Sequence, residues 1–158
     1  MTIFEDIMTI DILIVDDSRA DVRLVQEIFK KGKMIVNLYA VLDGMEAMEY
    51  LRKEGKYKNV RLPDLILLDL NMPRKDGREV LEDLKSDNEL KSIPVIVMTI
   101  SKSEEDILRS YKLHANAYIV KPIELNQFTN VVSSIENFWF TIVKLPPHIN
   151  NVNNIIEE

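Results

Sequence analysis

The sequence predicts an α/β fold, in which a doubly wound five-stranded parallel sheet carries helices on both faces. Short, wholly apolar runs such as residues 65–68 show no polar alternation and are too short for ordinary helices, which is typical of strands buried on both faces. Amphipathic segments alternate with these runs along the chain. Five such alternations, joined by right-handed crossovers, place helices on both faces of one sheet.

Chain length, composition and net charge limit the class of protein. The chain has 158 residues, 46% of them hydrophobic, so we expect one domain at residues 11–145, with an N-terminal extension at 1–10 and a polar, flexible tail at 146–158. The net charge of −6 argues against a nucleic-acid or membrane partner, since either requires clustered Lys and Arg. The sequence lacks an export signal and an apolar run near the ~20 residues that span a bilayer, which predicts a cytoplasmic protein.

The strands are predicted from apolar runs rich in β-branched residues. Four are continuous, whereas the second alternates, with Val36, Leu38 and Ala40 on one face, and is expected at the edge of the sheet. The predicted strands span residues 12–15, 34–42, 65–68, 94–98 and 117–120.

The first three helices are predicted from their end residues. Ser18 or Asp17 can cap the first helix, and Gly32 ends it. A second helix follows Gly44 and closes near Gly55, and the turn that contains Gly77 leads into a third.

The last two helices have clear N-terminal signals. Ser103, with Asp106 three residues on, marks the start of the fourth. After Glu124, apolar residues recur at steps of three and four, which predicts a long final helix that ends at Pro146. Its expected inward residues are Leu125, Phe128, Val132, Ile135, Trp139 and Ile142.

The end of this final helix is too apolar for one buried stripe, because six of the eight residues 138–145 are apolar. We expect a homodimer that uses Phe138, Trp139, Phe140 and Val143. The alternative is that this end folds back over the protein's own core.

Distinctive polar residues follow four of the predicted strands. Asp16 and Asp17 come after the first, Asp69 after the third, Thr99 after the fourth and Lys121 after the fifth. Because parallel strands point the same way, these side chains are expected to converge in one crevice. Singly, each has a simpler interpretation as a helix cap, a turn cap, a strand residue or a solvated lysine. Their coincidence favours a common site.

The electrostatics of such a site indicate phosphoryl chemistry. Two carboxylates about 5 Å apart repel by roughly 3 kcal/mol at an effective dielectric of 20, so the cluster needs a cation besides Lys121. An all-oxygen site suits Mg²⁺. Asp69 can then attack phosphorus as a nucleophile, with Lys121 offsetting charge and Thr99 donating a hydrogen bond to the phosphoryl oxygens.

These residues also match a known family in order and strand position. The matching residues are Asp16, Asp17, Asp69 with Asn71, the Asp76-Gly77 turn, Thr99, Lys121 and Pro122. Over roughly residues 11 to 145 the chain resembles the receiver domain of two-component response regulators, which has a flavodoxin-like topology.

The resemblance implies specific roles. It implies that Asp69 accepts a phosphoryl group from a sensor histidine kinase, and that Asp16, Asp17, Asp69 and the backbone carbonyl of Asn71 surround Mg²⁺. It also implies that the chain is not an enzyme beyond self-catalysed phosphotransfer and autodephosphorylation. The signal is then expected to leave through protein–protein contacts of a stand-alone regulator.

Further roles follow from the same resemblance. Thr99 and Tyr118 are expected to shift on phosphorylation, and the Lys121–Pro122 peptide is expected to be cis. Ile100 departs from the family's small residue, and its bulk is expected to narrow access to the phosphoryl site. The segments around Arg61, Arg74 and residues 138–140 further resemble single-domain regulators that pair with phytochrome-type kinases.

Two rival functions remain open from the residues alone. A haloacid-dehalogenase-like phosphohydrolase needs a second Asp two residues after Asp69, where this chain has Asn71. A flavodoxin-like cofactor carrier needs a glycine- and hydroxyl-rich phosphate loop after the first strand, where the acidic residues would repel phosphate.

Overall fold

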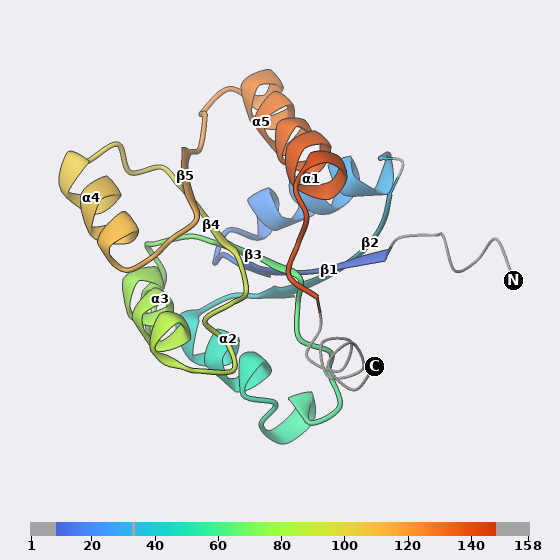
Figure 1. The fold of residues 1–158 in the computed structure, drawn as a ribbon. Helices are drawn as coiled ribbons and strands as arrows, with labels where there is room; N and C mark the ends of the chain where they lie inside the picture. The colour runs from blue at the N-terminus through green and yellow to red at the C-terminus, as the bar shows by residue number, and fades with distance from the viewer. Residues whose placement is uncertain (1–8, 33, 148–158) are drawn as a thin grey trace, which may run out of the picture.

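The computed structural model describes residues 9–32 and 34–147 and confirms the predicted fold (Figure 1). Five parallel strands form one sheet in the order β2-β1-β3-β4-β5, so the alternating second strand is at the edge, as predicted. The strands are β1 Thr9–Val15, β2 Ile35–Val41, β3 Leu65–Leu68, β4 Val95–Thr99 and β5 Ala117–Val120. The helices are α1 Arg19–Lys30, α2 Gly44–Leu51, α3 Gly77–Ser86, α4 Glu104–Lys112 and α5 Leu125–Asn137, with a 3-10 turn η2 at Gly55–Tyr57 and a π-helical segment η3 at Phe138–Ile142.

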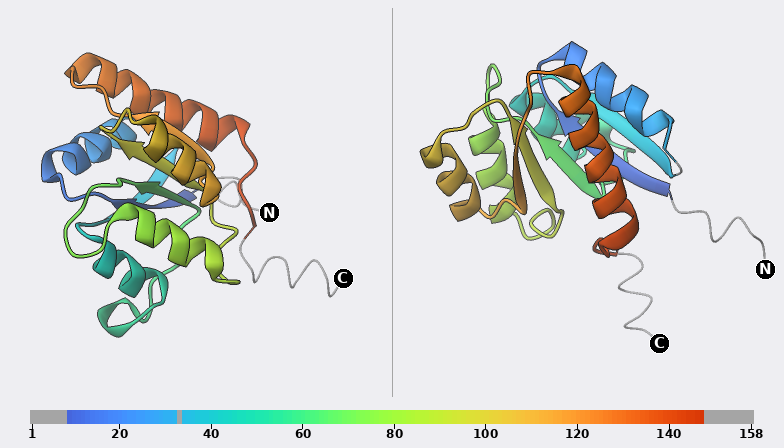
Figure 2. Two further views of the ribbon diagram at one scale, coloured as in Figure 1. Left: turned by 90° about the vertical axis from the view of Figure 1, so that its left-hand side faces the viewer. Right: turned by 90° about the horizontal axis from the view of Figure 1, so that it is seen from above.

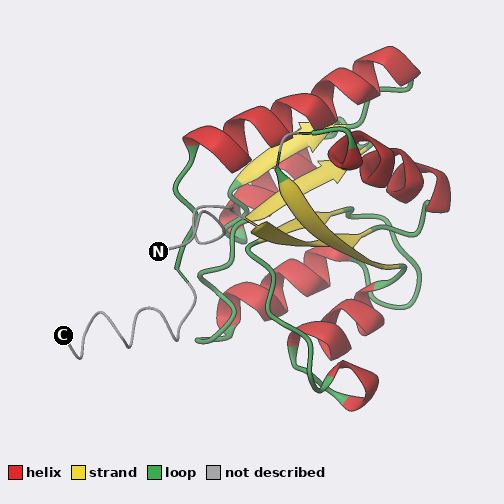
Figure 3. Cartoon of the chain, turned by 90° about the vertical axis from the view of Figure 1, so that its right-hand side faces the viewer, coloured by secondary structure: helices red, strands yellow, loops and turns green. Residues whose placement is uncertain are grey.

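Helices cover both faces of the sheet. α1 and α5 lie together on one face and α2 and α3 on the other, with the strands between them (Figure 2, Figure 3). Because successive strand residues point to opposite faces, the buried side chains form two clusters. One joins Ile12 and Ile14 to α1 and α5, and the other joins Leu13 and Val15 to α2 and α3.

The register of the strands brings the predicted site residues to one edge of the sheet. Val15 pairs with the residue before Asp69, so the residues after β1 and β3 are neighbours. The Asp69 amide donates to the Val15 carbonyl at 2.9 Å, and the Lys121 amide donates to the Thr99 carbonyl at 2.7 Å. The hydrogen bonds of the sheet therefore extend to the site residues themselves.

Side-chain caps begin four of the helices, each accepting a hydrogen bond from the amide three residues on. The caps are Ser18 on α1, Asp43 on α2, Asp76 on α3 and Ser103 on α4. Of the two candidates for the cap of α1, Ser18 is the one observed, and the predicted cap Ser103 of α4 is confirmed. These caps fix where each helix starts relative to the strand end before it.

The prediction of one continuous final helix is wrong at its C-terminal end. After Asn137, α5 gives way to the π-helical η3, and the helix ends at Ile142 instead of at Pro146. Val143 is already extended, with φ −75° and ψ 139°.

The π-helical turn changes which residues face inward. A π-helix is wider than an α-helix, so Phe140 follows Ile135 into the core at a spacing of five residues. Phe140 is 4% exposed and packs on Phe29, with ring centroids 5.2 Å apart. Trp139, expected inward, is only partly buried, and Ile142 is 62% exposed.

The predicted ends of the chain lie mostly outside the described residues, which exclude 1–8 and 148–158. β1 begins at Thr9, so the sheet includes two residues of the predicted extension. Over the described ranges, the structure contains no helix that is both long and apolar enough to cross a membrane.

Candidate functional site

The polar residues predicted at the strand ends lie at the carboxyl edge of the sheet. Asp16, Asp69, Thr99 and Lys121 are buried, with at most 8% exposed, whereas Asp17 is exposed. Polar and charged side chains are costly to bury unless they are paired. The hydrogen bonds and ion pairs of these buried side chains therefore show which residues form the site.

Lys121 is the centre of this group. Its Nζ donates to Asp16 Oδ2 at 2.6 Å, to Asp21 Oδ2 at 2.9 Å and to Asp69 Oδ2 at 3.2 Å. One ammonium thus faces three carboxylates. The convergence predicted for Asp16, Asp69 and Lys121 is observed.

Asp21 was missed by the sequence analysis. It lies in the first turn of α1, where its amide is already used by the Ser18 cap, so an acidic residue there looks like an ordinary favourable helix start. The sequence signal was its position shortly after Asp16 and Asp17, in the first turn of the helix that follows the first strand.

Burial sets the charge state of the site. Burial raises the pKa of Asp16 to about 6, although the hydrogen bond from Lys121 opposes the rise. For Lys121, burial alone would lower the pKa, but the hydrogen bond to Asp16 and the charges of Asp16 and Asp69 raise it overall. The ammonium therefore stays protonated, and a net negative charge remains among its carboxylate partners.

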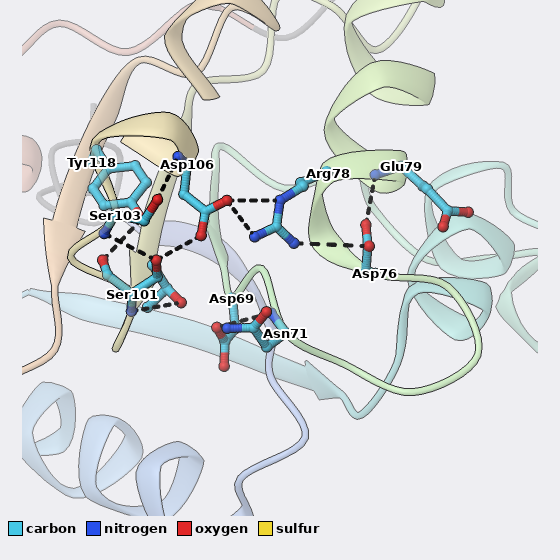
Figure 4. A network of polar contacts seen from close by, with 10 residues as sticks. Asp69, Asn71, Asp76, Arg78, Glu79, Ser101, Ser103, Asp106 and Tyr118 are labelled. Atoms are coloured by element: carbon cyan, nitrogen blue, oxygen red, sulfur yellow. Dashed lines mark hydrogen bonds and ion pairs between the residues drawn. The ribbon is translucent and has the colours of Figure 1, made fainter. Parts of the chain in front are cut away.

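The carboxylates fit a divalent cation. One oxygen each from Asp16, Asp17 and Asp69 lie within 4.8 Å of one another, and hard divalent cations prefer oxygen ligands of this kind. The Asn71 amide donates to Asp69 Oδ1 at 3.3 Å, which places the Asn71 backbone beside the cluster (Figure 4). The role of its carbonyl as a ligand remains a prediction.

The expectation of a cis peptide between Lys121 and Pro122 is wrong for this structure, because the described residues contain no cis peptide bond. The trans isomer before proline is favoured by about 0.5–1 kcal/mol. With the trans peptide, Lys121 already reaches three carboxylates, so the ion pairs of the site do not need the cis form.

Thr99 and Tyr118 are linked through Ser101. The Ser101 amide lies 3.5 Å from Thr99 Oγ1, and the Tyr118 hydroxyl donates to the Ser101 carbonyl at 3.0 Å (Figure 4). Ile100 is 67% exposed. Its side chain therefore projects largely into solvent, and the expectation that its bulk narrows the site gains no support.

A second polar network was not predicted. Arg78 Nη2 donates to Asp106 Oδ1 at 2.7 Å, and the Ser101 hydroxyl donates to Asp106 Oδ2 at 2.6 Å. In the sequence, Asp106 is recognisable only as part of a helix start. Its interaction with Arg78 joins α3 to α4 and could not be read from either helix alone.

The π-helical turn places one residue of the apolar segment 138–145 in the core and leaves others exposed or partly buried. Phe140, predicted as a dimer contact, is buried in the core, so this assignment is corrected. Phe138 is 50% exposed, and Trp139 and Val143 are partly buried. Phe138 and Trp139 line a hollow of about 370 Å³ over β5 and α5.

A separate cavity lies far from the carboxylates. Its volume is about 820 Å³, and residues before β3 and β4, such as Leu62 and Ile93, line it at the opposite edge of the sheet. The acidic cluster is therefore not part of this cavity.

The fold and the acidic site define a receiver domain. The family model described as the response regulator receiver domain matches residues 12–133, and the chain belongs to this family. It is a response regulator, a signalling protein, and nothing supports the phosphohydrolase or cofactor-carrier alternatives.

Among its relatives, response regulator Rcp1 of Synechocystis is 48% identical over 135 residues, which cover 85% of this chain and 92% of Rcp1. The structure of the phosphorylated cyanobacterial phytochrome response regulator RcpA is 50% identical with a TM-score of 0.86, covering 89% of this chain and 100% of RcpA. The Mn²⁺-bound form of Rcp1 is 47% identical with a TM-score of 0.85, covering 87% of this chain and 99% of that one. This chain is thus similar to phytochrome response regulators.

Proposed function

We propose that this response regulator accepts a phosphoryl group on Asp69 from a sensor histidine kinase in a Mg²⁺-dependent phosphorelay. The main support is the hydrogen bond from the Lys121 ammonium to Asp69, 3.2 Å long, beside Asp16 and Asp17. Asp69 is also the carboxylate that follows β3, the middle strand of the sheet.

The residues act as follows. A carboxylate oxygen of Asp69 attacks the phosphorus of a phosphohistidine, the phosphorus–nitrogen bond breaks, and the imidazole leaves with the electron pair. Lys121 neutralises charge on the phosphoryl oxygens, and Thr99 donates a hydrogen bond to one of them. Asp16, Asp17, Asp69 and the Asn71 carbonyl would hold Mg²⁺, which supplies positive charge to the phosphoryl group when bound.

The phosphoryl group is lost by hydrolysis at the same site. Water attacks the phosphorus of the phosphorylated Asp69, and the carboxylate leaves, which restores the starting side chain. In this hydrolysis the chain acts only on the phosphoryl group that its own Asp69 carries. We therefore class it as a phosphoacceptor and not as an enzyme with an external substrate.

The experiment that tests this proposal is incubation with phosphoramidate and Mg²⁺, followed by intact-mass measurement. The native chain is expected to gain the mass of one phosphoryl group, and Asp69→Asn is expected to gain none. Asp83→Asn, a carboxylate of α3 that pairs with Lys75 at 2.6 Å, is the matched control and should behave as the native chain. A phosphoryl gain by Asp69→Asn equal to that of the native chain would refute the assignment.

For the partner, we propose a phytochrome-type histidine kinase. Support comes from RcpA, which is named a phytochrome response regulator and is 50% identical to this chain. Phosphotransfer from a cyanobacterial phytochrome kinase should be faster than from a histidine kinase of an unrelated pathway at equal concentration. Equal rates would argue against this pairing.

For the output, we propose a switch at Thr99 and Tyr118. A phosphoryl group on Asp69 adds negative charge that the Thr99 hydroxyl can meet, and Ser101 connects Thr99 to Tyr118. The change biases two conformations of the loop after β4 and is then read by a partner protein. If Tyr118→Ala leaves partner affinity fully phosphorylation-dependent, this switch is wrong.

A further inference from the structure

Arg78 of α3 and Asp106 of α4 form a mostly buried ion pair next to the phosphoacceptor strand. Asp106 Oδ1 accepts from Arg78 Nη2 at 2.7 Å and from Arg78 Nε at 3.2 Å, and the side chains are only 17% and 20% exposed. Hydrogen bonds from Ser101 and Arg78 lower the pKa of Asp106. Charge-assisted contacts with this degree of burial are stronger than surface ion pairs.

On one side, this pair is tied to the backbone of Asp69. The Gly77 amide donates to the Leu70 carbonyl at 2.8 Å, and a Cβ on Gly77 would lie 2.1 Å from the Asp69 carbonyl oxygen. Only glycine allows this close approach of α3. Arg78 is the next residue, so its position is fixed relative to the phosphoacceptor.

On the other side, the pair is tied to the loop after β4. The Ser101 hydroxyl donates to Asp106 Oδ2 at 2.6 Å, and the Ser103 amide donates to the Ser101 hydroxyl at 3.3 Å. The Ser101 carbonyl then accepts the Tyr118 hydroxyl at 3.0 Å (Figure 4). Asp106 therefore fixes the position of Ser101, and the Ser101 carbonyl fixes the position of the Tyr118 hydroxyl.

We propose that Arg78 and Asp106 are positioning residues that clamp the loop after β4 in the conformation in which Ser101 binds the Tyr118 hydroxyl. The series of contacts starts at the carbonyl of Leu70, the residue after Asp69, and reaches Arg78 through its neighbour Gly77. It continues from Arg78 through Asp106 and Ser101 to Tyr118. The pair touches none of the carboxylates around Lys121, so it acts on the loop and not on the phosphoryl group. This inference deepens the proposed function, on which its consequence for signalling rests.

The test reads Tyr118 directly by fluorine NMR of protein labelled with 3-fluorotyrosine. Tyr118→Phe assigns its resonance among the five tyrosines. Arg78→Ala is expected to move the Tyr118 resonance toward the value of free fluorotyrosine and to leave the Tyr57 resonance in place, and Arg78→Lys is expected to restore it partly. Arg52→Ala removes an exposed ion pair with Asp83 at 3.9 Å and should change nothing.

A second measurement uses hydrogen exchange of the loop. In Arg78→Ala the Ser101 and Ser103 amides are expected to exchange about tenfold faster or more, because a hydrogen bond to a charged group is lost. If Arg78→Ala fails to fold, Asp106→Asn, which keeps the side-chain shape, decides by the same two readouts. Either an unchanged Tyr118 resonance or unchanged exchange of the loop amides in a folded variant would overturn the proposal.

These readouts separate this inference from the proposed function. Both use protein that has not been phosphorylated, so a failure of Asp69 to take up a phosphoryl group would leave their outcome unaffected. Conversely, normal phosphorylation of Asp69 with no effect of Arg78→Ala on Tyr118 would refute the clamp alone.

Discussion

Lys121 is the residue on which the charge balance of the site depends. In Lys121→Met, three carboxylates lose their shared ammonium, and we expect the free energy of unfolding without Mg²⁺ to fall by about 3 kcal/mol, the cost typical of a broken buried ion pair. Urea unfolding measures this, and added Mg²⁺ should recover part of the loss. Lys112→Met, at an exposed position of α4, is the control, and an equally small effect of both variants would show that the ammonium of Lys121 does not stabilise the site.

Asp16 makes cation binding pH-dependent. Because burial raises its pKa to about 6, the folded protein without a cation holds a proton there more tightly than the unfolded chain does. Its stability should therefore decline as pH rises from about 4 to about 6. Above pH 6 the carboxylate is free to bind a cation.

The thermal stabilisation by Mg²⁺ should consequently be larger at pH 8 than at pH 5, because protons compete for Asp16 at the lower pH. Differential scanning fluorimetry at constant Mg²⁺ concentration measures this. Equal stabilisation at both values of pH would show that Asp16 is not a ligand.

Residues directly after strands could be predicted as site residues, because parallel strands end at one edge of the sheet. Asp69 and Lys121 were found in this way. Asp21, Arg78 and Asp106 were not, because their partners lie 28 to 100 residues away and on different elements. Such contacts depend on how helices sit relative to one another, which periodicity does not encode.

At the scale of elements, the π-helical η3 decides which aromatic residue stabilises the C-terminal end. Phe140→Ala should lower the free energy of unfolding by about 3–5 kcal/mol, because it leaves a cavity beside Phe29. Trp139→Ala should cost less, since Trp139 is only partly buried. Urea unfolding of both variants provides the measurement, and the reverse order would mean that an α-helical register continues to Ile142.

The sequence could not reveal this turn. With Phe138, Trp139 and Phe140 in succession, every inward register offers an aromatic residue, so the apolar pattern fits an α-helix and a π-helix equally well. The helix starts were easier, because Ser18 and Ser103 act through local hydrogen bonds that reach only three residues along the chain.

At the scale of the whole molecule, the alternation of apolar runs and amphipathic segments was sufficient to predict the parallel sheet and its two helical layers. We propose a homodimer through the exposed part of the C-terminal end, because Phe138 and Ile142 are 50% and 62% exposed and apolar patches of this kind mark interfaces.

Light scattering at micromolar concentration should give close to twice the chain mass of 18.4 kDa, and Phe138→Asp should give the monomer. Met45→Asp, an exposed position on α2, is the control and should remain dimeric. A monomeric native protein, with and without phosphorylation, would rule out the dimer.

Asp69 is the proposed phosphoacceptor of this site, and the phosphorylated residue can be located chemically. After treatment with phosphoramidate and Mg²⁺, borohydride reduction converts an aspartyl phosphate into homoserine, which peptide mass spectrometry locates. The assignment of Asp69 predicts homoserine at position 69 and unchanged aspartate at positions 16, 17 and 21. Homoserine at any of those three positions, with aspartate retained at 69, would contradict it.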